Sequence, residues 1–299
     1  MFRRLSVTVA LTVVASLLPA PAFAWGFAAH RAIMRRAIDI LPPEIKPFFV
    51  EHRDEIIYRV VDPDMWRAIG WDEDHNHFVN FGAPELGPAP FTNMPRDYTA
   101  ALQKFGPVTL KALGTLPWRE AEMFGNLQRA VAGLGDQSAF TIERVVVFAA
   151  LASHYIQDAY QPLHASNNYD GQLTGQRGIH ARFEATLFER NESRLTITPG
   201  PLKAIPSPRD YAFDALLVSY QDVDALLKAD KEAIGAKDAY DDQYFEALFT
   251  RLKPMLEERL SAAVTATASV IVSAWEQAGR PSLTASVTTR APQKVQRTR

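Results

Sequence analysis

The chain has 299 residues, of which 47% are hydrophobic and 22% are charged. This apolar content is enough for one substantial core, and it excludes a disordered or fibrous protein. The formal net charge is −2, but the last twenty residues contain five basic side chains and no acidic one. Without these five and two arginines near the N-terminus, 25 basic residues face 34 acidic ones. A body this acidic does not attract nucleic acid by its overall charge, so a bound polyanion would need local positive charge.

The first 24 residues have the pattern of a secretory signal peptide. Two arginines precede an apolar stretch over residues 5–18, and Ala22-Phe23-Ala24 is a small-x-small cleavage site. The apolar stretch is shorter than the ~20 residues that a membrane-spanning helix needs, so we expect cleavage rather than anchoring. The mature protein would then begin at Trp25 and be secreted or periplasmic. It has no cysteine, so disulfides cannot stabilise it.

The first part of the mature chain predicts two helices and a loop. Apolar residues recur at helical spacing from His30 to Leu41, and Pro42 with Pro43 ends this helix and begins the next. The second helix has an apolar face made by four residues: Phe48, Phe49, Ile56 and Val60. Residues 81–96 contain two glycines and four prolines, which predict an irregular loop.

Helical patterns also dominate the rest of the chain. We expect one helix over about 117–133 and a longer one over 140–160, whose middle is apolar on every side and therefore central. A loop rich in glycine and asparagine precedes a helix that begins near His180. Ser207 has the position of a helix cap before Pro208, and Gly279 ends the last helix.

The elements together predict an all-α fold, because no segment shows a run of alternating strand residues. We expect one multi-helix domain over residues 25–279. Residues 280–299 form a basic tail containing Thr, Ser and Pro, which we expect to be a disordered, solvated terminus.

Histidines and acids at helical spacing are the chemical signal in the sequence. His154 and Asp158 are four residues apart, as are His180 and Glu184, so each pair projects from one helix face and could share a metal ion. His164 lies between the pairs. One such pair alone is also typical of a surface salt bridge. However, the helix with His154 and Asp158 is too apolar to face solvent, and metal ligation would satisfy polar groups there.

Further ligand candidates lie nearer the N-terminus. His30 is on the first predicted helix, and a carboxylate could come from the Asp62-Pro63-Asp64 corner. The pattern of residues does not by itself choose between Asp62 and Asp64.

The remaining histidines differ in their surroundings. His77 is preferred as a ligand to His75, because the apolar residues Phe78 and Val79 would carry it inward. His75 is expected to be a solvated loop residue. His52 lies among charged residues and is expected to be exposed on a helix.

These motifs, in this order, resemble a known superfamily. They comprise Trp25-Gly26-Phe27-Ala28-Ala29-His30, an Asp before a His-aromatic pair, His154-x3-Asp158-x5-His164 and His180-x3-Glu184. Together they look like the zinc-dependent bacterial phospholipases C and the single-strand-specific fungal and plant nucleases of the S-one/P-one type. The resemblance covers residues 25 to 184. It implies an all-α domain with three zinc ions at the base of a cleft.

The resemblance also implies a ligand set for each zinc ion. The first ion would be held by four side chains: Asp64, His77, His154 and Asp158. The second would be held by the amine and carbonyl of the N-terminal residue and two side chains, one of them shared: Trp25, His30 and Asp158. The third would be held by three side chains: His164, His180 and Glu184.

The implied reaction is hydrolysis of a phosphodiester by a zinc-bound hydroxide. Asp64 and Asp158 would hold the reacting ions, and Arg67 would contact phosphate, because Asp64-Met65-Trp66-Arg67 matches a nuclease pattern. That match favours Asp64 over Asp62. Three divalent ions would also supply the local positive charge that the acidic body lacks.

The substrate indicated first is single-stranded nucleic acid or a nucleotide. The five-residue step from Trp25 to His30 matches the nucleases. Phe78 resembles an aromatic residue that stacks on a base, and Asn80 resembles the group that hydrogen-bonds the base edge. Such stacking is worth ~1–3 kcal/mol per base and selects unpaired bases. Phe78 could instead be an ordinary core residue.

Other features favour the phospholipases. Glu184 and the short interval from His164 to His180 match them, and the loop over 81–95 could form an apolar cleft mouth. Their choline-binding cage is not recognisable, because other residues occupy its positions: Ala28, Met65 and Asp74. A zinc-dependent phospholipase C is therefore the alternative, and an exported zinc-binding protein without catalysis is a second one. No protein partner is implied.

Overall fold

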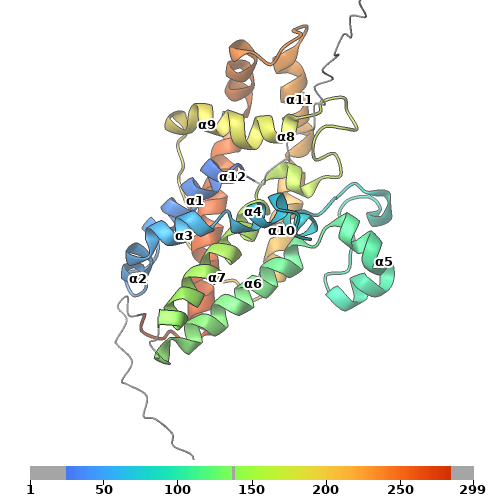
Figure 1. Ribbon diagram of the computed structural model, residues 1–299. Coiled ribbons are helices and arrows are strands. Elements are labelled where there is room, and N and C mark those ends of the chain that lie inside the picture. Colours follow the sequence, from blue (N-terminus) through green and yellow to red (C-terminus); the bar gives the residue numbers. More distant parts are fainter. Residues whose placement is uncertain (1–24, 137–138, 284–299) are drawn as a thin grey trace, which may run out of the picture.

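Helices α6 (Leu116–Ala132), α7 (Ala139–Asp158) and α12 (Asp242–Gln277) form the centre of the fold, and most of the other helices pack around them (Figure 1). This computed structural model describes residues 25–136 and 139–283. The predicted signal peptide and residues 284–299 of the predicted tail lie outside the described residues. The helices, with short 3-10 and π segments labelled η, are α1 (Phe27–Asp39), α2 (Lys46–Glu51), α3 (Arg53–Arg59), α4 (Asp62–Ala68), η1 (Asp74–His77), η2 (Pro84–Leu86), α5 (Tyr98–Leu113), α6 (Leu116–Ala132), η3 (Gly133–Asp136), α7 (Ala139–Asp158), η4 (Pro162–Ala165), α8 (Ile179–Ala181), η5 (Arg182–Leu187), α9 (Phe188–Asn191), η6 (Glu192–Arg194), α10 (Pro208–Tyr220), α11 (Val223–Ile234) and α12 (Asp242–Gln277).

The predicted all-α class is confirmed, because the described residues form helices and no strand. Their apolar side chains pack into one continuous core that extends from Trp25 to Ala274 on α12. None of the described helices is long and apolar enough to cross a membrane.

The central position predicted for the long apolar helix is confirmed. α7 begins and ends within two residues of the predicted bounds and packs against α6, α12, α3 and α1. Val146 and Ala149 in its middle are fully buried. Because neighbours surround this helix, its last turn lies in the interior, and His154 and Asp158 there are fully buried as well.

The predicted second helix is in fact two helices, α2 and α3. The chain turns at His52, where φ is −98° and ψ is 15°, outside helical values. This turn lets Phe48 on α2 and Ile56 on α3 both reach the core, and both short helices pack against α1. The expectation that His52 is exposed is wrong, because its ring packs 4.7 Å from the Phe48 ring and is partly buried.

Other predicted boundaries agree with the structure. Ser207 caps α10, since its side chain accepts a hydrogen bond from the Asp210 N–H. α12 ends two residues before Gly279, whose φ of 89° is accessible to glycine at low cost. The loop expected over 81–96 is irregular apart from the short segment η2.

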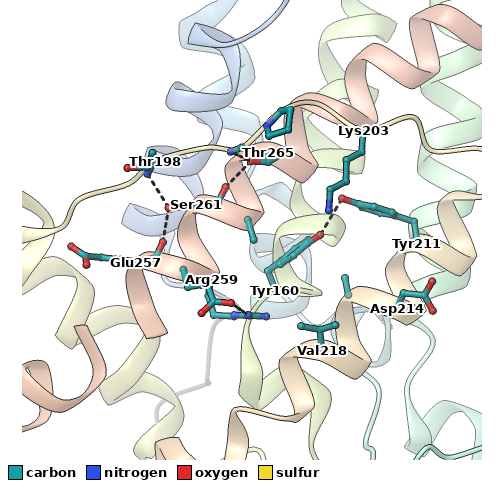
Figure 2. Close-up of a pocket in the computed structure, with 15 residues that line it drawn as sticks. Tyr160, Thr198, Lys203, Tyr211, Asp214, Val218, Glu257, Arg259, Ser261 and Thr265 are labelled. Carbon is teal, nitrogen blue, oxygen red and sulfur yellow. Dashed lines mark hydrogen bonds and ion pairs between the residues drawn. The ribbon is translucent and has the colours of Figure 1, made fainter. Parts of the chain in front are cut away.

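An extended segment over residues 195–205, here called the strap, lies along α12 (Figure 2). Its N–H groups donate to acceptors at every fourth residue of α12. The pairs are Thr196 with Glu257, Thr198 with Ser261, Gly200 with Thr265, Lys203 with Ser269, and Ile205 with Ser273. Four residues of a helix rise about 6 Å, and two residues of an extended chain span about 6.6 Å. Every second N–H of the strap therefore meets every fourth residue of α12. The exception is the step from Gly200 to Lys203, which has three residues and contains Pro201.

Three of the four hydroxyl groups of this ladder have two partners each. Ser261, Thr265 and Ser269 also donate to the carbonyl four residues earlier in α12, at 2.6, 2.9 and 2.7 Å. Each of these three hydroxyls therefore donates to its own helix and accepts from the strap. Residues of the strap also line a hollow of about 700 Å³, in whose wall the Tyr160 hydroxyl donates to that of Tyr211 at 3.1 Å (Figure 2).

Ser273→Ala should lower the free energy of unfolding by ~1–3 kcal/mol, because it leaves the Ile205 N–H buried without an acceptor. Ile205 and Ser273 are only 1% and 3% exposed, so water cannot replace the hydroxyl. Urea unfolding measures the change. The control is Thr267→Val in the same helix, because the described contact of the Thr267 hydroxyl is with the Ala263 carbonyl and not with the strap. Equal losses in both variants would contradict a stabilising ladder.

Candidate metal centre

Eight buried histidine and acidic side chains meet at the C-terminal end of α7. They come from α1, α4, η1, α7, η4, α8 and η5, and each is at most 5% exposed: His30, Asp64, His77, His154, Asp158, His164, His180 and Glu184. Their ligating atoms form three groups, within each of which the atoms lie no more than 4.8 Å apart. The groups are His30 with His154 and Asp158, Asp64 with His77 and His154, and His164 with His180 and Glu184. All the side chains predicted as ligands are therefore brought together.

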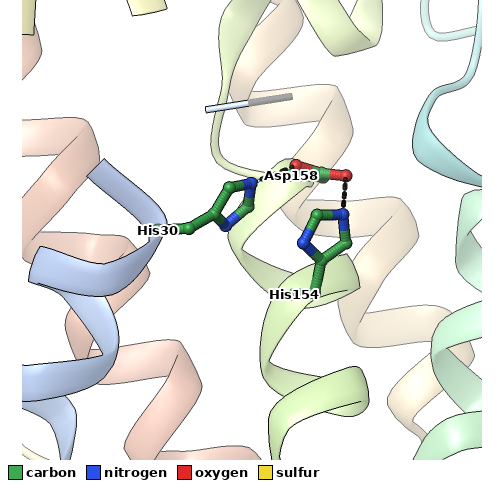
Figure 3. Close-up of side chains that lie close together, drawn as sticks. All are labelled: His30, His154 and Asp158. Carbon is green, nitrogen blue, oxygen red and sulfur yellow. Dashed lines mark ion pairs between the residues drawn. The ribbon is translucent and has the colours of Figure 1, made fainter. Parts of the chain in front are cut away.

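The first group is built on the Asp158 carboxylate, which faces a histidine with each oxygen (Figure 3). Nε2 of His30 lies 3.3 Å from Oδ1, and Nε2 of His154 lies 3.3 Å from Oδ2. The rings of His30 and His154 stack with their centroids 4.3 Å apart. One carboxylate thus links a residue of α1 to the last turn of α7.

The second group adjoins the first and shares His154 with it. Nδ1 of His77 lies 3.0 Å from Oδ2 of Asp158 and 3.1 Å from Nε2 of His154. It lies 3.8 Å from Oδ1 of Asp64. Nη2 of Arg67 approaches the same Asp64 oxygen to 3.6 Å. Asp158 and His154 therefore lie between the two groups and could serve both.

The third group lies on the loop and helix that follow α7. Nε2 of His180 is 3.2 Å from Nε2 of His164 and 2.8 Å from Oε2 of Glu184. Glu184 belongs to the π segment η5, and π turns are rare and frequent at functional sites. The group is joined to the second one, because Nδ1 of His164 donates to the His77 carbonyl at 2.6 Å.

Oxygen acceptors determine which nitrogen faces the centre in four of the histidines. Nδ1 lies 2.6–2.9 Å from an oxygen in each pair: His30 with Gln157, His154 with Val60, His164 with His77, and His180 with Tyr169. An oxygen acceptor requires the proton on Nδ1, so the Nε2 lone pair points to the centre. The lone pairs of His164 and His180 then face each other, which a proton or a cation between them makes favourable.

The donor set fits a metal ion. Several buried ligand atoms have no hydrogen-bond partner among the described residues: Nε2 of His30, both oxygens of Asp64 and Oδ1 of Asp158. Leaving such atoms unsatisfied costs ~1–3 kcal/mol each, and more when the group is charged. Imidazole nitrogens with carboxylate oxygens are typical ligands of zinc and related divalent ions. These buried groups could therefore hold metal ions.

The ionisation of these side chains follows from burial and from their mutual contacts. Burial lowers the pKa of His77 to about 3, which keeps this imidazole neutral at pH 7. Burial is the largest single effect on His154 and His164 and acts against their charge, but the nearby carboxylates and hydrogen bonds together outweigh it and raise the pKa of both. Burial raises the pKa of Asp64. Burial opposes charge on Asp158 too, yet the imidazoles around it hold its pKa well below the usual range.

A cleft of about 720 Å³ opens onto the centre, and its lining includes His77, His164 and His180. Arg67, Phe78 and Asn80, the other predicted site residues, line it too. Phe78 lies against the end of α5, where a Cβ at Gly114 would come within 2.1 Å of the Phe78 carbonyl oxygen. The Asn80 amide donates to the Ala112 carbonyl at 2.9 Å, which fixes that side chain at the wall of the cleft.

Trp25 is fully buried beside the centre. Its indole N–H donates to the Gln157 carbonyl at 2.9 Å, and its ring lies 5.9 Å from the Phe183 ring. The next residue packs closely as well, since a Cβ at Gly26 would lie 2.8 Å from the Cβ of Ala185 in η5. These contacts fix Trp25 next to the residues that carry the first and third groups.

The structure decides one choice that the residue pattern left open and corrects one expectation. Asp64 reaches the centre, whereas Asp62 belongs to none of the three groups and lies 3.7 Å from Arg59 instead. His75 is also outside the groups, but it is partly buried and lines the cleft, so the expectation of a fully solvated residue is wrong. The Thr115 N–H donates to the His75 carbonyl at 2.7 Å and holds His75 against the start of α6.

Two buried glutamines orient the ligands and are absent from the sequence prediction. Oε1 of Gln157 lies 2.6 Å from Nδ1 of His30, and the Gln161 amide donates to Oε2 of Glu184 at 2.8 Å. Such partners fix the ring or carboxylate that binds a metal. Each glutamine follows a potential ligand of α7 by three residues: Gln157 follows His154, and Gln161 follows Asp158. This spacing beside a buried ligand was the sequence signal that could have identified them.

No family model matches this chain, and a search of curated proteins gives no match either. The chemistry that can be argued for the centre therefore rests on the geometry of the described residues.

Gln157→Leu should weaken the binding of one metal ion ~10–100-fold, because His30 loses the oxygen that orients its ring. Titration with a divalent ion in competition with a chelator measures this affinity. Gln161→Leu is the matched variant and should instead weaken the ion held near Glu184. The same site affected in both variants, or neither site affected, would show that the glutamines do not orient separate ligands.

Proposed function

We propose that this chain is a secreted or periplasmic zinc-dependent phosphodiester hydrolase of the nuclease type, acting on single-stranded nucleic acid or nucleotides. The observation that carries the proposal is that two groups of potential ligands share His154 and are joined by Asp158, which belongs to the first group and lies 3.0 Å from His77 of the second. The third group is joined to the second through His164. Adjacent metal sites with shared ligands suit in-line displacement at phosphorus, because both the attacking and the leaving oxygen need stabilisation.

Three zinc ions would be held by the three groups of side chains. Asp158 fits a bridging position, since its two oxygens face different histidines. Zinc bound there supplies Lewis acidity, which lowers the pKa of water and stabilises charge on phosphoryl oxygens. The backbone of Trp25 would complete one site once residues 1–24 are removed, and the burial of Trp25 beside Gln157 supports this.

Residues of the cleft would bind the substrate phosphate. Arg67 lines the cleft and is held between Asp64, at 3.6 Å, and Asp74, at 3.4 Å. A guanidinium in this position can donate two parallel hydrogen bonds to phosphate oxygens. Lys111 lines the same cleft and pairs with Asp72. Acidic partners therefore balance both cations, and the bound metal ions would supply the net positive charge that a phosphate needs.

Two other residues of the cleft would bind a base. Phe78 lines the cleft and is held in place by the packing of its backbone on Gly114. The Asn80 amide nitrogen is used by the Ala112 carbonyl, and its Oδ1 is buried without a hydrogen-bond partner. A rotation of this side chain toward the cleft would let Oδ1 accept from a base. Stacking on Phe78 would favour single strands, since paired bases hide their faces.

A zinc-dependent phospholipase C is the second candidate, and the exposed apolar residues near the cleft favour it. Val108 lines the cleft and is 82% exposed, and Ile69 beside the cleft residue Ala68 is 66% exposed. Such side chains could admit acyl chains. Nuclease activity is ranked first because a cleft wall with Arg67, Lys111 and Asn80 suits a polyanion with bases.

The test is metal content and hydrolysis on the processed protein beginning at Trp25. Elemental analysis should find about three zinc ions per chain, and single-stranded DNA or RNA should be cleaved in preference to dispersed phospholipid. Phe78→Ala should lower kcat/KM for nucleic acid and leave the metal content unchanged. Cleavage of lipid alone would establish the second candidate, and bound zinc without cleavage of any phosphodiester would indicate a zinc-binding protein.

Asp158→Asn should reduce the content of two zinc ions, whereas Glu184→Gln should reduce that of one. The reason is that the Asp158 carboxylate faces two groups and the Glu184 carboxylate faces one. Elemental analysis of the two variants beside the unaltered protein measures the difference. Equal metal content in both variants would remove Asp158 from a bridging position.

A form with one additional residue before Trp25 should bind one zinc ion fewer and lose most of its activity. The additional residue converts the amine of Trp25 into an amide nitrogen, which is a poor metal ligand. Metal analysis and a phosphodiesterase assay on both forms check this. Full activity in the extended form would exclude the Trp25 amine from the centre.

A further inference from the structure

A second hollow of about 800 Å³ adjoins the cleft of the metal centre. His75 lines both spaces. The two following residues continue this connection, because Asn76 lines the hollow and His77 lines the cleft. The Thr115 hydroxyl donates to Oδ1 of Asn76 at 2.7 Å and fixes this junction to α6. The hollow and the cleft of the metal centre are therefore neighbours, and residues 75–77 form the boundary between them.

The hollow contains an exposed aromatic ring. Tyr98 at the start of α5 is 46% exposed, and it meets the Trp118 ring edge to face with centroids 5.6 Å apart. Trp118 is itself fixed, since its indole N–H donates to the Arg96 carbonyl at 2.8 Å. The Tyr98 ring thus has a rigid support and a surface that remains open to solvent. Such a ring can stack on any base.

A cation lies in the same hollow. Arg209 donates from Nε and Nη2 to the Asp210 carboxylate, at 3.1 Å each, and its side chain is 33% exposed. This leaves the Nη1 group of the guanidinium for another acceptor. The position suits a phosphate oxygen on a strand that leaves the cleft.

The carboxylates of the hollow already have partners. Asp97 caps α5, because its side chain accepts from the Ala100 N–H at 2.8 Å. Glu122 is paired with Arg119 at 2.9 Å. Their charge is partly compensated, so it opposes a phosphate less than two unpaired carboxylates would.

We propose that this hollow binds the part of a single-stranded oligonucleotide that extends beyond the metal centre. A base stacks on Tyr98, and a backbone phosphate is bound by Arg209. The alternation of an aromatic surface with a cation along a groove is typical of proteins that bind single strands. The inference rests on the proposed nuclease function and specifies its substrate as several linked nucleotides.

The experiment compares kcat/KM for a dinucleotide and for a single strand of about eight nucleotides, long enough to occupy both spaces. Tyr98→Ala should lower the value for the longer strand about tenfold, the loss of one stacked base, and leave the dinucleotide unchanged. Arg209→Gln should flatten the salt dependence of cleavage of the longer strand, because one phosphate contact is lost. The control is Tyr58→Ala, since Tyr58 is 69% exposed on α3 and lines neither space.

The outcomes separate this inference from the function on which it rests. Cleavage of neither nucleic acid by the unaltered protein would overturn the nuclease function itself. Cleavage of both substrates, with Tyr98→Ala and Arg209→Gln acting equally on the two lengths or on neither, would overturn the hollow as a binding site. A loss confined to the longer strand in both variants, with Tyr58→Ala unchanged, supports it.

Discussion

The burial of the Asp158 carboxylate at the end of α7 is the constraint on which the rest of the structure depends. A carboxylate removed from water is costly unless charges and hydrogen bonds compensate it. Histidines from α1, η1, α7 and η4 approach it within 4 Å, which ties four parts of the chain to one point. The helices can pack around an apolar core only if these polar groups are satisfied together.

The surroundings of the centre are arranged to keep these ligands in position. Carbonyl and amide oxygens fix the histidine tautomers, and Gln157 links His30 to Trp25 through its side chain and its backbone. A second set of contacts holds the loop of His77, since Tyr155 donates to Oε1 of Glu73 and Arg119 lies 3.2 Å from the other oxygen. A chain without cysteine is thus held by polar contacts at its centre and by the strap along α12.

Much of the fold was predictable because it depends on local patterns. The apolar patterns predicted helices over 117–133 and 140–160, whose ends agree with those of α6 and α7 within two residues, and the Ser207 cap marked the start of α10. The break at His52 was not predictable in this way, since it depends on how Phe48 and Ile56 share the core. The strap is a further case, because its acceptors on α12 look like ordinary small residues until the extended chain is placed beside them.

The sequence by itself determined the helical class, the central place of α7 and the residue types that could hold a metal, because spacing along a helix sets which side chains share a face. The tertiary structure decided that Asp64 rather than Asp62 joins the centre, that His75 lies at the boundary of two hollows, and that Gln157 and Gln161 orient ligands. These facts depend on contacts between residues far apart in the chain. The direction in which a loop presents its side chains is fixed only when the helices on either side are packed.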